Sequence, residues 1–310
     1  MIKKNSKLLV TGASGFLGTF LLKALKKKGY DNLYCPSYRE IDLREKLACE
    51  KAVKDVDGIL HLAGNVGGVG YLAENPGSIF YDNATISLNL IEAARESGVK
   101  KFIAVGTATA YPQSAPVPFK ETDFWNGYPA EAVAAYAMSK KLALVQLQAY
   151  RKQFGFNGIY LILANMYGPG DNFDEKSSGV IPALMRLVRQ AKAQKKSSIE
   201  VCGAGSASRE FLYVEDGADA IMTVMEKYEK GEPVNISSGK EVTIKELAGT
   251  ICRLMNYSGR IAWNKHKPTG QPRVSLDTSR AAKEFGFRAK TSLEEGLRQT
   301  IAWYEQQVNS

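Results

Sequence analysis

Tyr136 and Lys140 are the residues whose types and spacing point most directly to chemistry. They are four positions apart in a stretch with helical periodicity, so both side chains project from one face of a helix. A phenol with a pKa of about 10 is a poor proton donor at neutral pH, but a neighbouring ammonium group stabilises the phenolate and lowers that pKa. The pair therefore predicts proton transfer at a substrate oxygen. Because this spacing is also common on helix surfaces, the prediction needs support from elsewhere in the chain.

Thr107 gives the first support. It directly follows the apolar run KFIAVG, which predicts a strand over 101–106. Ligands of open α/β sheets bind at the C-terminal ends of the strands. We therefore expect the Thr107 hydroxyl to hold the substrate oxygen to which Tyr136 transfers a proton, with Thr107, Tyr136 and Lys140 as the catalytic residues.

A glycine-rich loop gives the second support. The sequence TGASGFLG at 11–18 lies between a predicted strand at 7–11 and a predicted helix at 16–28. Glycines let the backbone turn tightly and approach a pyrophosphate, and the N–H groups at the start of the helix solvate its charge. A glycine motif alone is weak evidence, but strand, loop and helix follow in the order that dinucleotide binding requires. From this loop the cofactor is expected to contact Gly12, Ser14, Gly15, Phe16, Leu17 and Gly18.

The end of the second predicted strand, 32–36, bears on the choice between NAD and NADP. An acidic residue there accepts hydrogen bonds from the ribose 2′-hydroxyl of NAD, whereas an arginine accommodates the 2′-phosphate of NADP. The sequence offers Ser37 and Arg39 and has no acid before Glu40. NADP(H) is therefore the predicted cofactor. Its further expected contacts are Arg39, Asp42, Leu43, Leu62, Ala63, Gly64, Tyr136, Lys140 and Asn165.

The elements that position these residues alternate along the chain. Strands are predicted at 7–11, 32–36, 58–63, 101–106 and 158–163, and helices at 16–28, 83–97 and 134–154. This alternation indicates an α/β fold, a doubly wound parallel sheet of the Rossmann type. It breaks after Tyr167, continues with a helix at 181–192, and returns with a helix near 214–228 and a strand at 233–236. We expect a Rossmann domain of 1–165 plus about 211–237, and a smaller, mostly C-terminal substrate-binding domain of about 166–210 plus 238–310.

Composition narrows the class of ligand and compartment. The chain has 310 residues and a formal net charge of +9. Its content of 45% hydrophobic and 24% charged residues is typical of globular proteins. The lysines are dispersed, so the charge favours anionic small ligands over nucleic acid. Four scattered cysteines and two histidines, His61 and His266, predict neither a disulfide framework nor a metal site. Without a run of roughly 18 apolar residues or the apolar region of a signal peptide, no membrane span and a cytoplasmic location are expected.

Together these residues resemble the extended short-chain dehydrogenase/reductase family. The glycines of the loop, Thr107, and the Tyr136-x-x-x-Lys140 pair carry the resemblance. Five further segments are similar to the GDP-L-fucose synthase branch of that family: HLAGNVGGV at 61–69, NMYGPGDNF at 165–173, GVIPAL at 179–184, REFLYVED at 209–216 and KPTGQPR at 267–273. Members of that branch epimerise GDP-4-keto-6-deoxymannose at C3 and C5 and then reduce C4 with NADPH.

The resemblance implies a partner and a substrate site. It implies a homodimer formed through the helices around 83–97 and 134–154. It also implies a nucleotide-sugar substrate whose diphosphate is bound in part by Arg186 and Arg209, although Arg186 on a helix is equally compatible with a solvated role. The residues expected at the substrate site are Val66, Thr109, Asn165, Gly179, Val180, Arg186, Cys202 and Arg209.

Departures from that branch change the predicted reaction. The branch has a Cys two residues beyond the catalytic Ser or Thr and a His directly before V-I-P-A-L, where this chain has Thr109 and Gly179. Moving a proton from carbon needs an acid and a base with pKa values near the working pH, and neither residue provides one. Epimerisation is therefore not expected unless another side chain reaches the sugar, namely Asp171, Asp174, Glu175 or Lys176. Cys202 replaces a Trp that contacts the base in that branch, so the base need not be guanine.

The resulting hypothesis is an NADPH-dependent 4-keto reductase of a nucleotide-diphosphate sugar, GDP-linked and a 6-deoxyhexose or heptose. A nucleotide-sugar 4-epimerase with retained NAD stays open, because TATAY at 107–111 is similar to the S-A-T-x-Y of that branch. A full epimerase/reductase also stays open. A dehydratase is disfavoured because Ala108 and Thr109 stand where it has an Asp-Glu pair. An idle NADP-binding scaffold is disfavoured because the catalytic set is intact.

Overall fold

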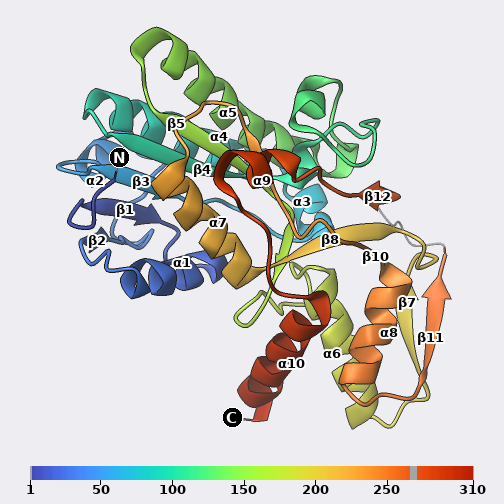
Figure 1. Ribbon diagram of the computed structural model, residues 1–310. Coiled ribbons are helices and arrows are strands. Elements are labelled where there is room, and N and C mark those ends of the chain that lie inside the picture. Colours follow the sequence, from blue (N-terminus) through green and yellow to red (C-terminus); the bar gives the residue numbers. More distant parts are fainter. Residues whose placement is uncertain (1, 266–270, 310) are drawn as a thin grey trace.

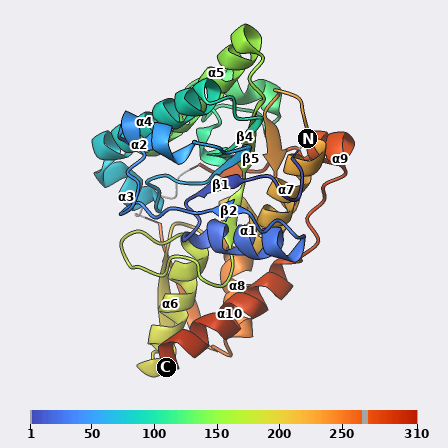
Figure 2. The ribbon, with the colours of Figure 1, turned by 90° about the vertical axis from the view of Figure 1, so that its left-hand side faces the viewer.

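The computed structural model describes residues 2–265 and 271–309 and has a larger and a smaller part (Figure 1). The larger part is built on a parallel sheet, and the smaller part lies at one side of it and holds the C-terminal helix (Figure 2). His266 and much of the 267–273 segment lie outside the described residues. None of the described helices combines the length and apolar character needed to cross a membrane.

The larger sheet has six parallel strands in the order β2-β1-β3-β4-β5-β9. The strands are β1 (Leu8–Thr11), β2 (Leu33–Tyr34), β3 (Gly58–His61), β4 (Lys101–Thr107), β5 (Gly158–Leu163) and β9 (Val234–Ile236). Every residue of β1, β3 and β5 is buried, because helices cover both faces of a sheet of this kind. The prediction of a doubly wound Rossmann-type fold is confirmed.

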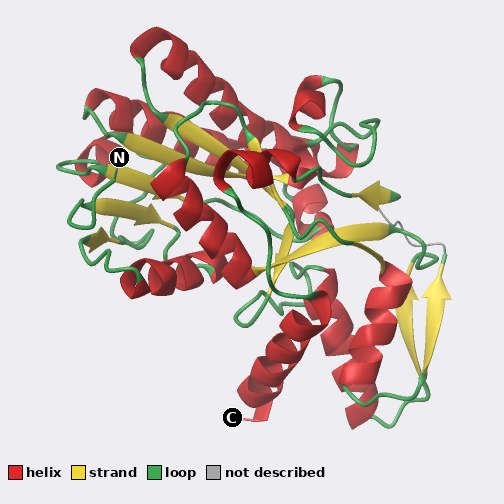
Figure 3. Ribbon diagram, in the orientation of Figure 1, coloured by secondary structure: helices red, strands yellow, loops and turns green. Residues whose placement is uncertain are grey.

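Helices form a layer on each face of this sheet (Figures 1 and 3). One layer contains α2 (Lys46–Ala52), α4 (Pro76–Glu96) and α5 (Ala134–Phe154), and the other contains α1 (Phe16–Lys27) and α7 (Val214–Lys227). Side chains from the strands bind to both layers. Tyr160 of β5 donates a hydrogen bond to the Lys140 carbonyl of α5, and Lys101 of β4 donates to the Met225 carbonyl of α7.

The smaller part contains short strands and three long helices. Its elements are β6 (Asn165–Tyr167), α6 (Val180–Ala193), β7 (Ser198–Cys202), β8 (Ser208–Tyr213), β10 (Glu241–Thr243), α8 (Ile244–Leu254), β11 (Arg260–Asn264), β12 (Arg273–Val274) and α10 (Leu293–Asn309). β8 pairs with β6, β10 and β12, while β7 pairs with β11. α6, α8 and α10 pack together around buried Met185, Ile251 and Leu297. The remaining elements are α3 (Val69–Glu74), α9 (Ser279–Phe285) and the 3-10 turns η1 (Ala108–Ala110), η2 (Glu121–Trp125) and η3 (Glu131–Val133).

The predicted elements agree with the structure except at particular boundaries. The helix predicted to begin at residue 83 begins at Pro76, because proline at the first helical position needs no hydrogen-bond acceptor for its nitrogen. The strand predicted at 32–36 is only Leu33–Tyr34. The strand predicted at 233–236 does return to the first sheet, beside β5. The larger core also includes Leu276 and Phe285, residues that the predicted division assigns to the smaller domain.

Candidate active site

The glycine loop after β1 is packed at backbone distance from its neighbours. Gly12 has a φ of +69°, a conformation that favours glycine. A Cβ on Gly12 would lie 2.8 Å from the backbone nitrogen of Ala63, and one on Gly18 would lie 2.2 Å from the carbonyl oxygen of Gly12. The loop, the end of β3 and the start of α1 can therefore meet only because these side chains are absent.

The helix α1 begins directly after this loop. Gly15 is its N-cap, no side chain caps it, and its first turn has no acidic residue. Ser14 and Gly15 are exposed, Phe16 is half-buried, and Leu17 is buried in the core. The unpaired N–H groups and the helix dipole favour an anion at this point. These residues fit the pyrophosphate of a dinucleotide.

The loop after β2 holds the residues predicted to choose between NAD and NADP. The backbone nitrogen and hydroxyl of Ser37 both donate to Glu40 Oε2, at 2.7 and 2.8 Å. These bonds hold the pKa of Glu40 below its usual value. Arg39 is exposed, with its Nε 3.5 Å from the Tyr38 hydroxyl. Ser37 is thus engaged with Glu40, and Arg39 is the cation that this loop presents to solvent.

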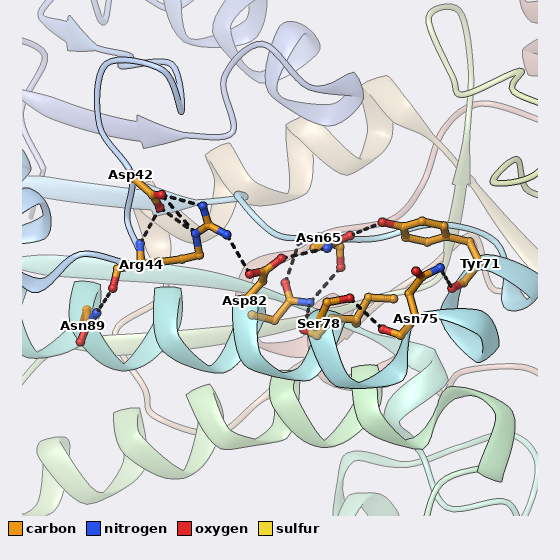
Figure 4. Close-up of polar contacts among 10 residues, drawn as sticks. Asp42, Arg44, Asn65, Tyr71, Asn75, Ser78, Asp82 and Asn89 are labelled. Atoms are coloured by element: carbon orange, nitrogen blue, oxygen red, sulfur yellow. Dashed lines mark hydrogen bonds and ion pairs between the residues drawn. The ribbon is translucent and has the colours of Figure 1, made fainter.

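A line of polar side chains connects this loop to the loop after β3 (Figure 4). Arg44 Nη2 donates to Asp42 Oδ2 at 2.7 Å, and Arg44 Nη1 donates to Asp82 Oδ1 at 3.2 Å. Asn65 Nδ2 donates to Asp82 at 3.0 Å, and the Tyr71 hydroxyl donates to Asn65 at 3.0 Å. Hydrogen bonds from Arg44 lower the pKa of Asp42. Asp42, predicted to contact the cofactor, thereby becomes part of a support for both loops.

Asn83 of α4 shapes the loop after β3. Its Oδ1 accepts from the Asn65 backbone nitrogen at 2.9 Å, and its Nδ2 donates to the Asn65 carbonyl at 2.8 Å. A Cβ on Gly64 would lie 2.7 Å from Asn83 Oδ1 and 3.6 Å from Lys140 Nζ. The loop therefore runs beside Lys140. Its predicted cofactor contacts Leu62 and Ala63 are half-buried, Gly64 is exposed, and Leu43 is buried behind the preceding loop.

Asn83 is not among the residues predicted from the sequence. The only signal in the sequence is an asparagine on the buried face of an amphipathic helix, where an apolar residue is usual.

Thr107 and Tyr136 lie in contact, and Lys140 follows Tyr136 by four residues on α5. The Tyr136 hydroxyl is hydrogen-bonded to the Thr107 side chain. Burial raises the pKa of Tyr136 to about 12, and the bond with Thr107 acts in the opposite direction. Burial lowers the pKa of Lys140 to about 8. Thr107 Oγ1 also accepts from the Thr109 backbone nitrogen at 3.2 Å, and this bond fixes the hydroxyl at the start of the turn.

A buried histidine lies under the same loops. His61, the last residue of β3, shares a 2.8 Å hydrogen bond between its Nδ1 and Thr11 Oγ1. Thr11 Oγ1 also accepts from the Ala63 backbone nitrogen at 3.2 Å. Burial, together with the charge of Lys140, lowers the pKa of His61 to about 3. His61 is therefore neutral at physiological pH and ties β1 to β3 below the glycine loop.

The predicted substrate residues after β3 and before α6 are adjacent. The Gly68 backbone nitrogen donates to the Ser177 carbonyl at 2.7 Å, and a Cβ on Gly68 would lie 2.5 Å from the Ser178 carbonyl oxygen. The loop that carries Val66 therefore contacts the segment that directly precedes Gly179 and Val180, and Val66 is exposed. A Cβ on Gly179, the N-cap of α6, would have no atom within 4 Å in the part of the chain that the structure describes. The position has room for a side chain.

Arg186 of α6 holds the preceding loop. Its Nη1 donates to the Phe173 carbonyl at 3.1 Å, the Asp174 carbonyl at 3.3 Å and the Ser178 hydroxyl at 3.2 Å. Its role as a diphosphate ligand remains a prediction, since these bonds show only that it fixes the loop. In the same loop, burial raises the pKa of Asp171 to about 7. Ser177 and neighbouring backbone groups lower that of exposed Asp174.

Three of the other predicted substrate residues lie on strands of the smaller part, and Thr109 lies after β4. Arg209 is half-buried on β8, between β10 and β12, and burial lowers its pKa while nearby Glu241 opposes that shift. Asn165 is exposed at the start of β6, and Cys202 is exposed at the end of β7. Thr109, in the turn after Thr107, is half-buried. The binding roles of these residues remain predictions.

Known proteins resemble this chain along its whole length. The model of the NAD dependent epimerase/dehydratase family matches residues 8–237. A putative GDP-L-fucose synthase 2 from Arabidopsis thaliana is 36% identical over 310 residues, which cover 99% of this chain and 94% of the relative. A GDP-6-OMe-4-keto-L-xylo-heptose reductase from C. jejuni has a TM-score of 0.92 and 26% identity over 99% of both chains. A GDP-mannoheptose C4 reductase from Campylobacter jejuni, solved with NADP bound, has a TM-score of 0.88 and 27% identity over 98% of this chain and 100% of that one.

These findings confirm the resemblance to the GDP-L-fucose synthase branch and the prediction of an oxidoreductase. The prediction of NADP(H) as the cofactor agrees with the NADP-bound relative. The chain has the glycine loop at 11–18 and the residues Thr107, Tyr136 and Lys140. It belongs to the NAD dependent epimerase/dehydratase family, the extended short-chain dehydrogenase/reductase enzymes.

Proposed function

We propose that this protein reduces the 4-keto group of a GDP-linked 6-deoxyhexose or heptose with NADPH and leaves C3 and C5 unchanged. The observation that carries the proposal is the bond between Tyr136 and Thr107, together with Lys140, which lies beside the loop after β3 that Gly12 also contacts. The relatives support the substrate class, because they include a putative GDP-L-fucose synthase and a GDP-mannoheptose C4 reductase.

Each of these three residues has a distinct role in this reaction. Bound NADPH supplies the hydride that C4 receives. Tyr136 donates the proton to the carbonyl oxygen, and Thr107, whose oxygen already accepts from Thr109, orients that oxygen with its own hydroxyl proton. Lys140 binds the ribose, and in its protonated form it lowers the pKa of Tyr136 from its buried value.

Reduction without epimerisation follows from what the substrate side lacks. Thr109 has no group that titrates near neutral pH, and Gly179 has no side chain. Asp171 is the residue most able to replace a missing base, because burial brings its pKa to about 7. The test of the proposal therefore includes an Asp171 variant.

We also propose that the enzyme is a homodimer formed through α4 and α5. Phe80, Tyr81 and Leu88 on α4 and Val145 on α5 are large apolar side chains exposed to solvent. Tyr81 and Leu88 are seven positions apart and so lie on one stripe of the helix. Light scattering should give twice the mass of the chain, and Leu88→Glu should shift it to the monomer. A native protein of monomer mass at micromolar concentration contradicts this proposal.

The decisive experiment measures whether the hydrogens at C3 and C5 of the sugar exchange with solvent. Purified enzyme, NADPH and GDP-4-keto-6-deoxymannose are incubated in D₂O, and the product is examined by NMR. We expect NADPH to be consumed, C4 to be reduced, and no deuterium at C3 or C5 beyond an enzyme-free control.

Other outcomes point to other functions. Deuterium at C3 or C5 that disappears in Asp171→Asn shows that this carboxylate replaces the missing base and that the enzyme also epimerises. A second incubation uses a GDP-hexose that carries a hydroxyl at C4, and inversion of that C4 without consumption of NADPH would indicate a 4-epimerase with retained NAD. Absence of any reaction with both a 6-deoxyhexose and a heptose substrate contradicts the proposed function.

A further inference from the structure

We propose that Tyr111 and Asn235 are positioning residues that fix the turn carrying Thr107 relative to the strand carrying Arg209. The inference rests on the proposed function, in which Thr107 holds the sugar carbonyl and Arg209 contributes to the diphosphate site. It concerns residues that touch neither cofactor nor substrate.

Tyr111 anchors the catalytic turn from behind. It is the residue that ends η1, the turn that begins at Thr107, and its side chain is fully buried. Its ring stacks on Phe119 with centroids 4.8 Å apart and meets the edge of Phe124 at 5.0 Å. Burial raises the pKa of Tyr111, so the hydroxyl stays protonated, and it donates to Asn235 Oδ1 at 2.8 Å.

Asn235 forms hydrogen bonds to several segments that are distant from it in the sequence. It lies in β9, the edge strand of the large sheet, with no exposed surface. Its Nδ2 donates to the Phe119 carbonyl at 2.9 Å and the Asp277 carbonyl at 3.1 Å. Its backbone nitrogen donates to Glu121 Oε1 at 2.9 Å. Every hydrogen-bonding group of the amide side chain is therefore connected to a different segment.

Glu210 continues the network to the substrate side. It is buried on β8 directly after Arg209, and consecutive strand residues point to opposite faces. Its Oε2 accepts from the hydroxyl of Ser237, which is two residues after Asn235. Its Oε1 accepts from the Ser275 hydroxyl at 2.5 Å and the Leu276 nitrogen at 3.3 Å.

Residues 275–277 join the bonds of Asn235 to those of Glu210. The Phe119 nitrogen donates to the Ser275 carbonyl at 2.7 Å, and the Asp277 nitrogen donates to the Phe119 carbonyl at 2.9 Å. The catalytic turn and the Arg209 strand are thus held by the same buried segment. Buried polar networks of this kind specify one arrangement, because any displacement leaves groups without partners. Misplacing a reacting group by about 1 Å costs up to roughly 100-fold in rate.

Tyr111→Phe tests the inference, because it removes one hydroxyl and keeps the ring. The matched control is Tyr228→Phe, which removes another buried hydroxyl, one that donates to the Glu232 carbonyl at 3.1 Å after the end of α7. We measure kcat, the KM for the GDP-4-keto sugar, the affinities for NADPH and GDP, and backbone hydrogen exchange of both variants. We expect Tyr111→Phe to lower kcat about 10- to 100-fold while both affinities stay within about twofold. Tyr228→Phe should keep the native kcat.

Hydrogen exchange provides a readout that does not depend on turnover. In Tyr111→Phe, exchange should rise in 108–111, 237–239 and 275–277 together, and Glu210→Gln should raise exchange in the same three segments. An increase confined to 108–111, or an equal loss of kcat in Tyr228→Phe, overturns the inference. If the native enzyme does not reduce the sugar, the proposed function fails, and the exchange pattern alone then decides whether the coupling between the segments exists.

Discussion

The two proposed sides of this site differ in how closely the backbone is packed. The cofactor side is the glycine loop with Gly12 and Gly18, and the substrate side is the start of α6 at Gly179. At Gly12 and Gly18 the backbones are so close that an added Cβ would lie 2.2–2.8 Å from a neighbouring backbone atom. At Gly179, on the proposed substrate side, an added Cβ would meet no atom of the described residues within 4 Å. A change on the cofactor side therefore disturbs the fold, whereas a change on the substrate side can alter the reaction and leave the fold intact. We therefore expect the proposed substrate side to tolerate substitutions that the cofactor side does not.

The largest effect on turnover should come from substitution of Tyr136, the proposed proton donor. Tyr136→Phe should lower kcat by roughly 10²- to 10⁴-fold, the range for loss of a positioned proton donor. NADPH affinity should barely change, because the variant keeps the ring and loses only one hydroxyl, which is not a main binding group for the cofactor. Steady-state kinetics and a cofactor titration measure both quantities. Near-native turnover in the variant would assign the proton donor to another residue.

A matched pair of glycine substitutions tests the comparison directly. Gly18→Ala should destabilise the protein by about 1–3 kcal/mol and weaken NADPH binding, because its Cβ would overlap the Gly12 carbonyl. Gly179→Ala should leave thermal stability and NADPH affinity unchanged, because the same methyl group enters open space. Thermal unfolding with and without NADPH measures both. Equal effects in the two variants would refute the contrast between the two sides.

Arg39 should determine cofactor preference. We expect the native protein to bind NADPH more tightly than NADH, and Arg39→Ala to remove about 1.5–3 kcal/mol of that preference, the contribution of a hydrogen bond to a charged group. NADH affinity should not change, since NADH has no 2′-phosphate. Titration of both cofactors checks the prediction. Tyr38→Phe is a control on the same loop, and equal affinities for both cofactors in the native protein would contradict it.

The last prediction concerns the pH dependence of stability that the buried His61 causes. The pKa of His61 falls from 6.5 to about 3 on folding, so between these values the unfolded chain binds more protons than the folded protein. The stability that depends on neutral His61 is complete above pH 6.5 and decreases as the pH falls towards 3, by at most about 1.4 kcal/mol per pH unit. His61→Gln lacks this contribution. Urea unfolding between pH 4 and 8 should therefore give a shallower slope for the variant, and parallel slopes would exclude the effect.

The parts of the site that could be predicted from the sequence depend on local order. The glycines, Thr107 and the Tyr136–Lys140 pair lie at the ends of strands or on one helix face, and periodicity reveals both. The residues that were missed make long-range contacts. Tyr111 and Asn235 are 124 positions apart, and nothing in either segment indicates the partner.

The smaller part was predicted least well for a related reason. Its strands have only two to six residues and no regular spacing, so their pairing depends on the packing of distant segments. Arg186 illustrates the same limit. Its three bonds to the 173–178 loop depend on a loop conformation that no periodicity encodes.

The position of β9 has a consequence for synthesis of the chain. β9 completes the edge of the large sheet beside β5, although β5 ends at Leu163 and β9 begins only at Val234. A ribosome that adds roughly 5–20 residues per second needs several seconds to make the intervening segment. During that interval the nascent chain presents the apolar edge of β5, an edge that readily pairs with other chains. A truncated chain ending near residue 165 should therefore aggregate, and chaperone capture should be most productive before β9 leaves the ribosome.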